Sequence, residues 1–161
     1  MRKALLATAG VACLVACALG PDFDKFEPAH SPEGVRAFAF VTASRGSVAG
    51  TEVQGELLEV RKEGLLVLGT LGEVREEGSK KVPMRHSGGS RRVVLVAFGG
   101  IQQARFEGMG RGCELDDGIA PTDVVRERLR LVSRFPQGLS PELLRRLLEI
   151  HGQADVQKVG P

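Results

Sequence analysis

The chain has 161 residues, of which 42% are hydrophobic and 26% are charged, and its formal net charge is +2 at pH 7. These values are typical of one soluble folded domain with short appendages, and they exclude an intrinsically disordered chain. Trp and Tyr are absent and Phe occurs seven times. This scarcity weighs against a surface that stacks sugars, bases or flat cofactors.

The N-terminal residues have the parts of an export signal. Residues 1–3 carry two positive charges, and residues 4–16 form an uncharged run, ALLATAGVACLVA. As a helix this run would be about 20 Å long, which is too short for a hydrocarbon core of about 30 Å. A cationic start, a short apolar run and small residues behind it predict a signal peptide over residues 1–16.

The end of this run resembles the lipobox of bacterial lipoproteins, which the residues Leu14-Val15-Ala16-Cys17 match at all four positions. The resemblance implies that a signal peptidase cuts before Cys17 and that Cys17 becomes an acylated first residue. It also implies a location in the cell envelope, facing away from the cytoplasm. Ala18 stands where an aspartate favours retention in the inner membrane, so the resemblance indicates the outer membrane if the cell has one.

A second reading of the same site stays open, because Ala16-Cys17-Ala18 also fits the A-x-A pattern of ordinary signal cleavage. Cleavage after Ala18 would release a secreted soluble protein.

In the lipidated form Cys113 is the one remaining free thiol, and we expect it to pack inertly. Loss of Arg2 and Lys3 lowers the Lys and Arg count from 22 to 20, equal to the 20 Asp and Glu. No nucleic-acid partner is therefore expected.

Behind the lipobox, residues 17–34 have the composition of a flexible tether, with three prolines and no hydrophobic period. A β-rich part follows over residues 35–108. Its β-branched and aromatic runs are separated by glycine-containing turns. They predict five strands, at residues 35–42, 51–60, 65–71, 92–98 and 101–108. Two of the runs are apolar on both faces, which is typical of a closed or covered sheet.

The order of these strands and corners resembles a small Sm-like β-barrel. The resemblance rests on GELLEV at 55–60, LLVL at 65–68 and VAFGGI at 96–101. It implies barrel geometry for about 70 residues. The RNA-binding residues of that family are not matched, because the hairpin reads Lys62-Glu63-Gly64 and the later corner is Gly99-Gly100.

The last third, residues 109–152, is predicted to be helical and to pack on the outer apolar face of the β part. Val125, Leu129 and Val132 form one stripe of a helix over 122–134 that Thr122 caps. Ser140 and Pro141 begin a second helix, and residues 153–161 look frayed. The expected fold class is therefore α+β, with a small five-stranded antiparallel β-barrel or strongly bent sheet followed by two C-terminal amphipathic helices.

The sequence predicts no catalytic, cofactor or metal site. The three histidines, His30, His86 and His151, have no second ligand at metal-site spacing. The acidic corner Glu114-Leu115-Asp116-Asp117 lacks the spaced oxygens of a calcium loop. We therefore expect a protein that is not an enzyme.

One basic segment could bind anions, and it leaves two functional hypotheses. Between residues 80 and 92 lie basic residues and no acid, as a predicted loop; the possible anion-binding residues are Lys80, Lys81, Arg85, Arg91 and Arg92. The first hypothesis is a lipid-anchored envelope protein with a non-catalytic interaction or structural role and an envelope protein as partner. The second is a module that binds anionic lipid or polymer through this loop.

Overall fold

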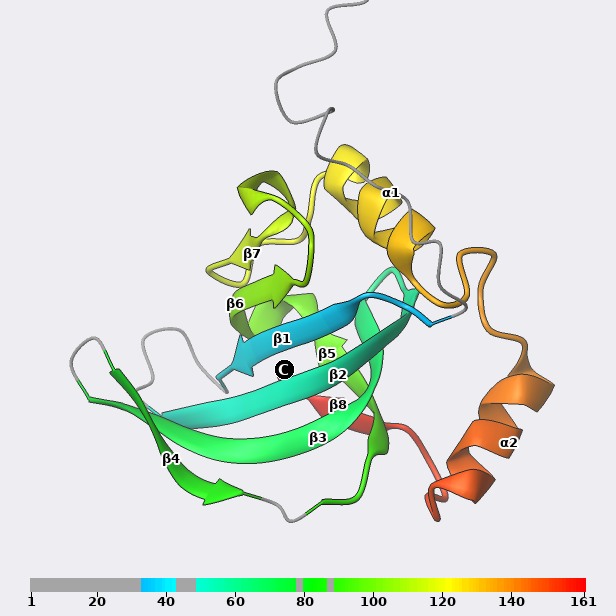
Figure 1. Cartoon of the computed structure of the whole chain (residues 1–161), viewed down its shortest axis with the longest axis horizontal. Helices are drawn as coiled ribbons and strands as arrows, with labels where there is room; N and C mark the ends of the chain where they lie inside the picture. Colours follow the sequence, from blue (N-terminus) through cyan, green and yellow to red (C-terminus); the bar gives the residue numbers. More distant parts are fainter. Residues whose placement is uncertain (1–32, 43–48, 78–79, 87–88) are drawn as a thin grey trace, which may run out of the picture.

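A computed structural model of the chain describes residues 33–42, 49–77, 80–86 and 89–161 (Figure 1). The signal peptide, Cys17 and nearly all of the predicted tether lie outside these residues. None of the helices within the described ranges has the length and apolar character needed to cross a bilayer.

The described residues form an α+β fold of eight strands and two α-helices, as the predicted fold class requires. The helices are α1 (Asp123–Val132) and α2 (Pro141–Ile150), and two 3-10 turns cover Phe98–Gly100 and Arg111–Cys113. The strands are β1 (Arg36–Val41), β2 (Ala49–Val60), β3 (Gly64–Glu77), β4 (Lys80–His86), β5 (Arg92–Ala97), β6 (Ile101–Phe106), β7 (Leu115–Asp116) and β8 (Gln157–Val159).

All eight strands belong to one sheet, in the order β7-β6-β1-β2-β3-β5-β8, with β4 paired to β3 beside this path. Every pairing is antiparallel except that of β8 with β5. The path ends at β7 and at β8, so the sheet is not closed and the five-stranded barrel is not matched. Figure 1 shows β2 and β3 strongly curved, as the alternative of a bent sheet predicts.

The five predicted strands are all present, and hydrophobic clusters cover both faces of their central part. Leu65 and Val67 of β3 face a cluster enclosed by the curved sheet, while Leu66 and Leu68 face a second cluster outside it. β5 alternates in the same way. The runs that are apolar on both faces are therefore explained by a sheet covered on both sides.

The two helices have the predicted caps but cover different parts of the sheet. The hydroxyls of Thr122 and Ser140 accept hydrogen bonds from Val125 N–H and Leu143 N–H. α2 packs on the outer cluster through Leu148, as expected. α1 was expected there too, but Leu129 belongs to the enclosed cluster. α1 therefore covers an open end of the bent sheet, where the enclosed side chains would otherwise meet water.

Three segments differ from the sequence prediction. Residues 80–86 form β4, not a loop, because β3 continues to Glu77 and supplies a pairing edge. Residues 157–159 form β8 beside β5, so the tail is not frayed. The predicted helical part opens instead with a 3-10 turn and β7, and its first α-helix begins at Asp123.

Candidate functional site

The predicted basic residues of β4 lie opposite acids in the β3–β4 hairpin. The register pairs Lys80 with Glu77, Lys81 with Glu76 and Arg85 with Glu73. Directly opposite residues in an antiparallel pair have Cβ atoms about 5 Å apart. The register therefore places each of these three basic residues across from an acidic residue of β3.

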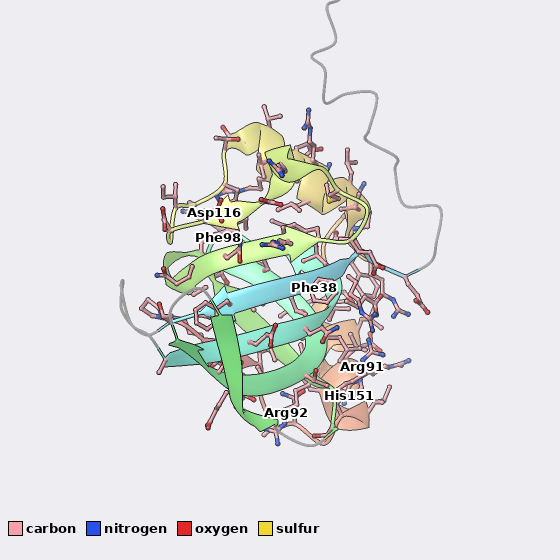
Figure 2. The ribbon with its side chains drawn as sticks, turned by 60° about the vertical axis from the view of Figure 1, so that its left-hand side comes forward. Phe38, Arg91, Arg92, Phe98, Asp116 and His151 are labelled. Atoms are coloured by element: carbon pink, nitrogen blue, oxygen red, sulfur yellow. The ribbon has the colours of Figure 1, made fainter. Side chains whose placement is uncertain are left out.

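The other two predicted anion-binding residues, Arg91 and Arg92, take part in contacts within the domain. Arg91 Nη2 lies 3.7 Å from Glu56 Oε2 and donates to the Leu68 carbonyl over 3.4 Å. Arg92 Nη1 donates to Gln157 Oε1 over 3.3 Å. In Figure 2 both lie on the side of the molecule that carries α2. These contacts assign the two arginines structural roles, although both side chains are exposed.

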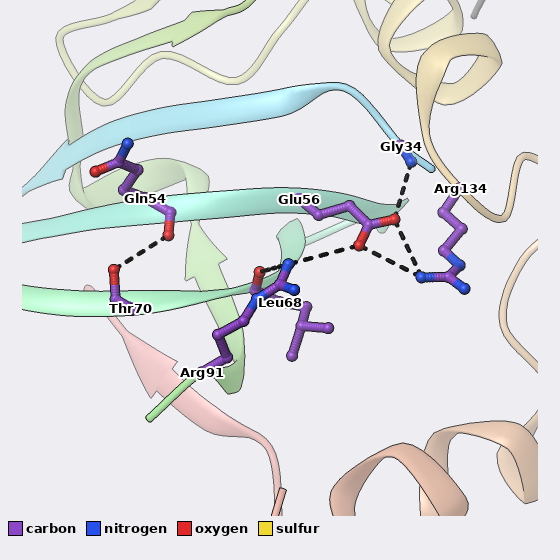
Figure 3. Close-up of polar contacts among 7 residues, drawn as sticks. All are labelled: Gly34, Gln54, Glu56, Leu68, Thr70, Arg91 and Arg134. Carbon is purple, nitrogen blue, oxygen red and sulfur yellow. Dashed lines mark hydrogen bonds and ion pairs between the residues drawn. The ribbon is translucent and has the colours of Figure 1, made fainter. Parts of the chain in front are cut away.

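Glu56 of β2 is the centre of the most concentrated polar cluster in the described chain (Figure 3). Its side chain is only 10% exposed. Oε1 accepts from Gly34 N–H over 2.9 Å and from Arg134 Nη1 over 3.3 Å, and Arg91 approaches Oε2. A buried carboxylate is tolerated only when it is paired and hydrogen-bonded, and both conditions are met here.

Backbone hydrogen bonds surround this cluster and join three parts of the chain. Val35 N–H donates to the Val132 carbonyl over 2.9 Å, and Leu57 N–H donates to the Val35 carbonyl over 2.8 Å. Arg134 N–H donates to the Leu57 carbonyl over 3.0 Å. We call Gly34, Val35, Glu56, Leu57 and Arg134 the entry junction. It fixes the start of the domain to β2 and to the end of α1.

Gly34 is needed in the entry junction because the backbones approach too closely for a side chain. A Cβ atom at this position would lie 2.0 Å from the Leu57 carbonyl oxygen and 2.7 Å from Arg134 N. Both neighbours are backbone atoms that are held by hydrogen bonds. The last residue of the predicted tether is thus sterically restricted to glycine.

α1 has one buried face and one exposed apolar face. Leu129 and Val132 are buried, whereas Val124 and Leu131 are 62% and 46% exposed. Arg126 is half-buried, with its guanidinium carbon 5.9 Å from the centre of the Phe98 ring. Ile119, just before the helix, is 65% exposed.

Arg130 ties the last turns of α1 together and to the segment that follows. Its Nη2 and Nε donate to Glu127 Oε1 over 2.6 Å and to Oε2 over 2.8 Å. Its Nη1 donates to the Pro136 carbonyl. The hydrogen bonds from Arg130 lower the pKa of Glu127, and they raise the pKa of Arg130 in return. Arg130 therefore holds a structural position.

The remaining candidate residues lie apart from one another. Cys113 is buried in the second 3-10 turn, and His151 is the C-cap of α2. Asp117 has a φ of 56° and Gly118 a φ of 67°, so the acidic corner is a left-handed turn. Within the described ranges no three His, Cys, Asp or Glu side chains gather in a way that could hold a metal ion.

The comparisons with known proteins give no match to any family model, to any curated protein or to any solved structure. The function is therefore inferred from the residues and their arrangement. The entry junction was missed in the sequence because Glu56 and Arg134 are 78 positions apart. The apolar surroundings of Glu56, in GELLEV, are the one local signal that this acid is buried.

Proposed function

We propose that the protein is a lipid-anchored protein of the bacterial cell envelope whose folded domain has a non-catalytic interaction or structural role. The observation that carries the proposal is Leu14-Val15-Ala16-Cys17 directly behind a cationic start and a short apolar run. Two acyl chains anchor a protein stably, since each buried methylene contributes about 0.8 kcal/mol and one chain alone holds only marginally.

The position of the folded domain supports this proposal. The first described residue is Glu33, and both hydrophobic clusters are built from residues 35 onwards. Fifteen residues, 18–32, separate Cys17 from the first described residue in the sequence.

The anchor is tested by Cys17→Ser, with Cys13→Ser as the matched control inside the apolar run. We expect the parent and the control to enter the detergent phase and the Cys17→Ser protein to stay in the aqueous phase. Mass spectrometry of the mature N-terminus should find diacylglycerol and acyl groups on Cys17. A Cys17→Ser protein that fractionates as the parent does would overturn the anchor. An unmodified N-terminus at Leu19 in the soluble fraction would establish release instead.

The interaction role is tested by isolating the anchored protein from solubilised envelopes. We expect a partner protein in a fixed ratio that a second, unrelated detergent also preserves. Recovery of the protein alone under both conditions contradicts an interaction role.

The alternative of an anion-binding module is tested on the β3–β4 hairpin. Lys80→Glu, Lys81→Glu and Arg85→Glu are combined, so that Arg91 remains available to Glu56. The acids opposite these residues lead us to expect unchanged retention on vesicles that contain phosphatidylglycerol. Loss of retention in the triple variant, with Arg105→Glu on β6 as control, would support the anion-binding module.

A further inference from the structure

The exposed face of α1 is the largest apolar helix surface that lies beside the start of the domain. Val124 and Leu131 are seven residues apart, so they lie on the same side of the helix, about 10 Å from each other along its axis. The buried stripe of α1 faces the enclosed cluster through Leu129. Val124 and Leu131 therefore form a second stripe that no described residue buries.

The chain enters the domain at the C-terminal end of this helix. Val35 is hydrogen-bonded to Val132, in the last turn of α1, and Gly34 is hydrogen-bonded to Glu56. The entry junction therefore fixes residue 33 beside the end of α1 that carries Leu131. The segment that precedes residue 33 starts from this end.

The segment that precedes residue 33 contains both aromatic and acidic residues. Residues 18–32 contain Phe23 and Phe26, flanked by three acids and one lysine, which gives a net charge of −2. The chain from Cys17 onwards is formally neutral, so the rest of it carries +2. Arg130 and Arg134, on α1 and just behind it, are already paired with Glu127 and Glu56. The apolar residues of the segment therefore match the exposed face of α1, and the net charges of the segment and of the rest of the chain are opposite in sign.

We propose that residues 22–26 lie along the exposed face of α1, with Phe26 against Leu131 and Phe23 against Val124. The spacing fits this order. Glu33 is seven positions after Phe26, and seven steps of chain span at most about 24 Å, which is longer than the whole of α1 at about 15 Å. Phe26 is three positions after Phe23, and three steps of extended chain cover about 10 Å, the distance between the two apolar positions on the helix.

Intrachain docking is favoured over a second copy of the chain because of concentration. A segment linked to the end of α1 by a few residues has an effective concentration in the millimolar range, so a weak contact suffices. Docking leaves residues 18–21 as the free link to Cys17. If the protein is anchored as proposed above, α1 faces the bilayer. The docking itself does not depend on that anchor.

The absence of Trp and Tyr allows a direct test. Phe26→Trp, made in residues 18–161 so that the described core is intact, introduces a single indole. We expect its emission to be blue-shifted, and acrylamide quenching about threefold weaker than in a free peptide of residues 18–32, because docking shields the ring from solvent. Leu131→Asp should remove both effects. Ile150→Asp, at the 76% exposed end of α2, is the matched control and should leave them unchanged.

Several results would overturn the proposal. Phe26→Trp emission equal to that of the free peptide excludes docking, as does emission that Leu131→Asp leaves unchanged. A shift that disappears on dilution indicates a second copy of the chain. A shift that requires added vesicles indicates a bilayer as the occupant. Far-UV circular dichroism of each variant verifies that the domain is folded, and a Cys17→Ser result of either sign leaves this measurement unaffected.

Discussion

The buried carboxylate of Glu56 joins three segments that are distant in the sequence. A carboxylate that loses water must regain hydrogen bonds, and Glu56 regains them from Gly34 and Arg134, with Arg91 nearby. Because both arginines remain partly in water, their ion pairs with Glu56 contribute less than fully buried pairs would. The main effect of the cluster is geometric, since it fixes where the chain enters the domain.

The entry junction predicts that Gly34→Ala is strongly destabilising. The new methyl group would meet two hydrogen-bonded backbone atoms that can move only if the junction opens. We expect the free energy of unfolding to fall by about 3 kcal/mol, at the upper end of the cost of overpacking. Urea denaturation measures this change.

Gly110→Ala is the matched control for this substitution. Nothing lies within 4 Å of a Cβ atom at Gly110, and its φ of −69° suits any residue. We expect a change within about 0.5 kcal/mol. Equal effects of the two substitutions would contradict the close approach at Gly34.

The Glu127–Arg130 pair predicts a pH dependence. Because the bound guanidinium favours the charged carboxylate, the pKa of Glu127 lies below its ordinary value in the folded state. The stability that this pair adds is therefore present above the pKa of the unfolded state and is lost as pH falls through the folded pKa. Carboxyl NMR titration should find this low midpoint, and Arg130→Gln should return it to the ordinary value. An unchanged midpoint in Arg130→Gln would refute the assigned cause.

Among the elements, those with local signals were predictable from the sequence. The caps Thr122 and Ser140 were found because an N-cap is a property of four adjacent residues. The turn of Arg61 to Gly64 was found for the same reason, and Arg61 N–H donates to the Gly64 carbonyl. β4 was missed because its sequence, KKVPMRH, has charges, a proline and no apolar alternation.

β8 was missed because its pairing begins with hydrogen bonds from a side chain, that of Gln153, to the backbone of β5. Gln153 Oε1 accepts from Val93 N–H over 2.6 Å, and its Nε2 donates to the Val93 carbonyl over 3.2 Å. One amide thus supplies both hydrogen bonds of a β-partner at the start of β5. The backbone of residues 157–159 then continues the pairing. No sequence pattern marks a glutamine for this role.

We therefore predict that Gln153→Ala loosens β8. The substitution leaves two backbone groups of Val93 without their partner, which costs about 2 kcal/mol. Amide hydrogen exchange should become faster in residues 157–159. Gln102→Ala on β6 serves as the control, because the described hydrogen bond of Gln102 with Asp117 N–H uses its backbone carbonyl, which the substitution keeps. Unchanged exchange in β8 would show that the strand pairing alone is sufficient.

At the scale of the whole molecule, the sheet separates two hydrophobic clusters of unequal size. The enclosed cluster contains fifteen buried residues and includes Leu129 of α1, whereas the outer cluster contains six and includes Leu148 of α2. The sequence indicated that both faces of the sheet were covered. It did not indicate which helix covers which cluster, because both apolar stripes have the same period and similar residues.

This asymmetry predicts that α2 opens separately from the rest of the domain. Leu148 is the one buried side chain that α2 itself contributes, and Leu143 and Ile150 are exposed. Local unfolding of a weakly held helix costs less free energy than global unfolding. We therefore expect amides of α2 to exchange through a local opening and amides of β1 and β2 through global unfolding.

Two substitutions distinguish these openings. Leu129→Ala should lower the free energy of global unfolding by about 3 kcal/mol, as a cavity in a buried cluster does. It should leave amide exchange in α2 unchanged, because the local opening of α2 does not involve the enclosed cluster. The substitution therefore changes the free energies of the docked and the locally opened states equally. Leu148→Ala should accelerate amide exchange both in α2 and in β1 and β2. It destabilises the state in which α2 is docked, relative to the locally opened state and to the globally unfolded state. If Leu129→Ala accelerates α2 exchange as much as β1 exchange, the two clusters unfold as a single cooperative unit.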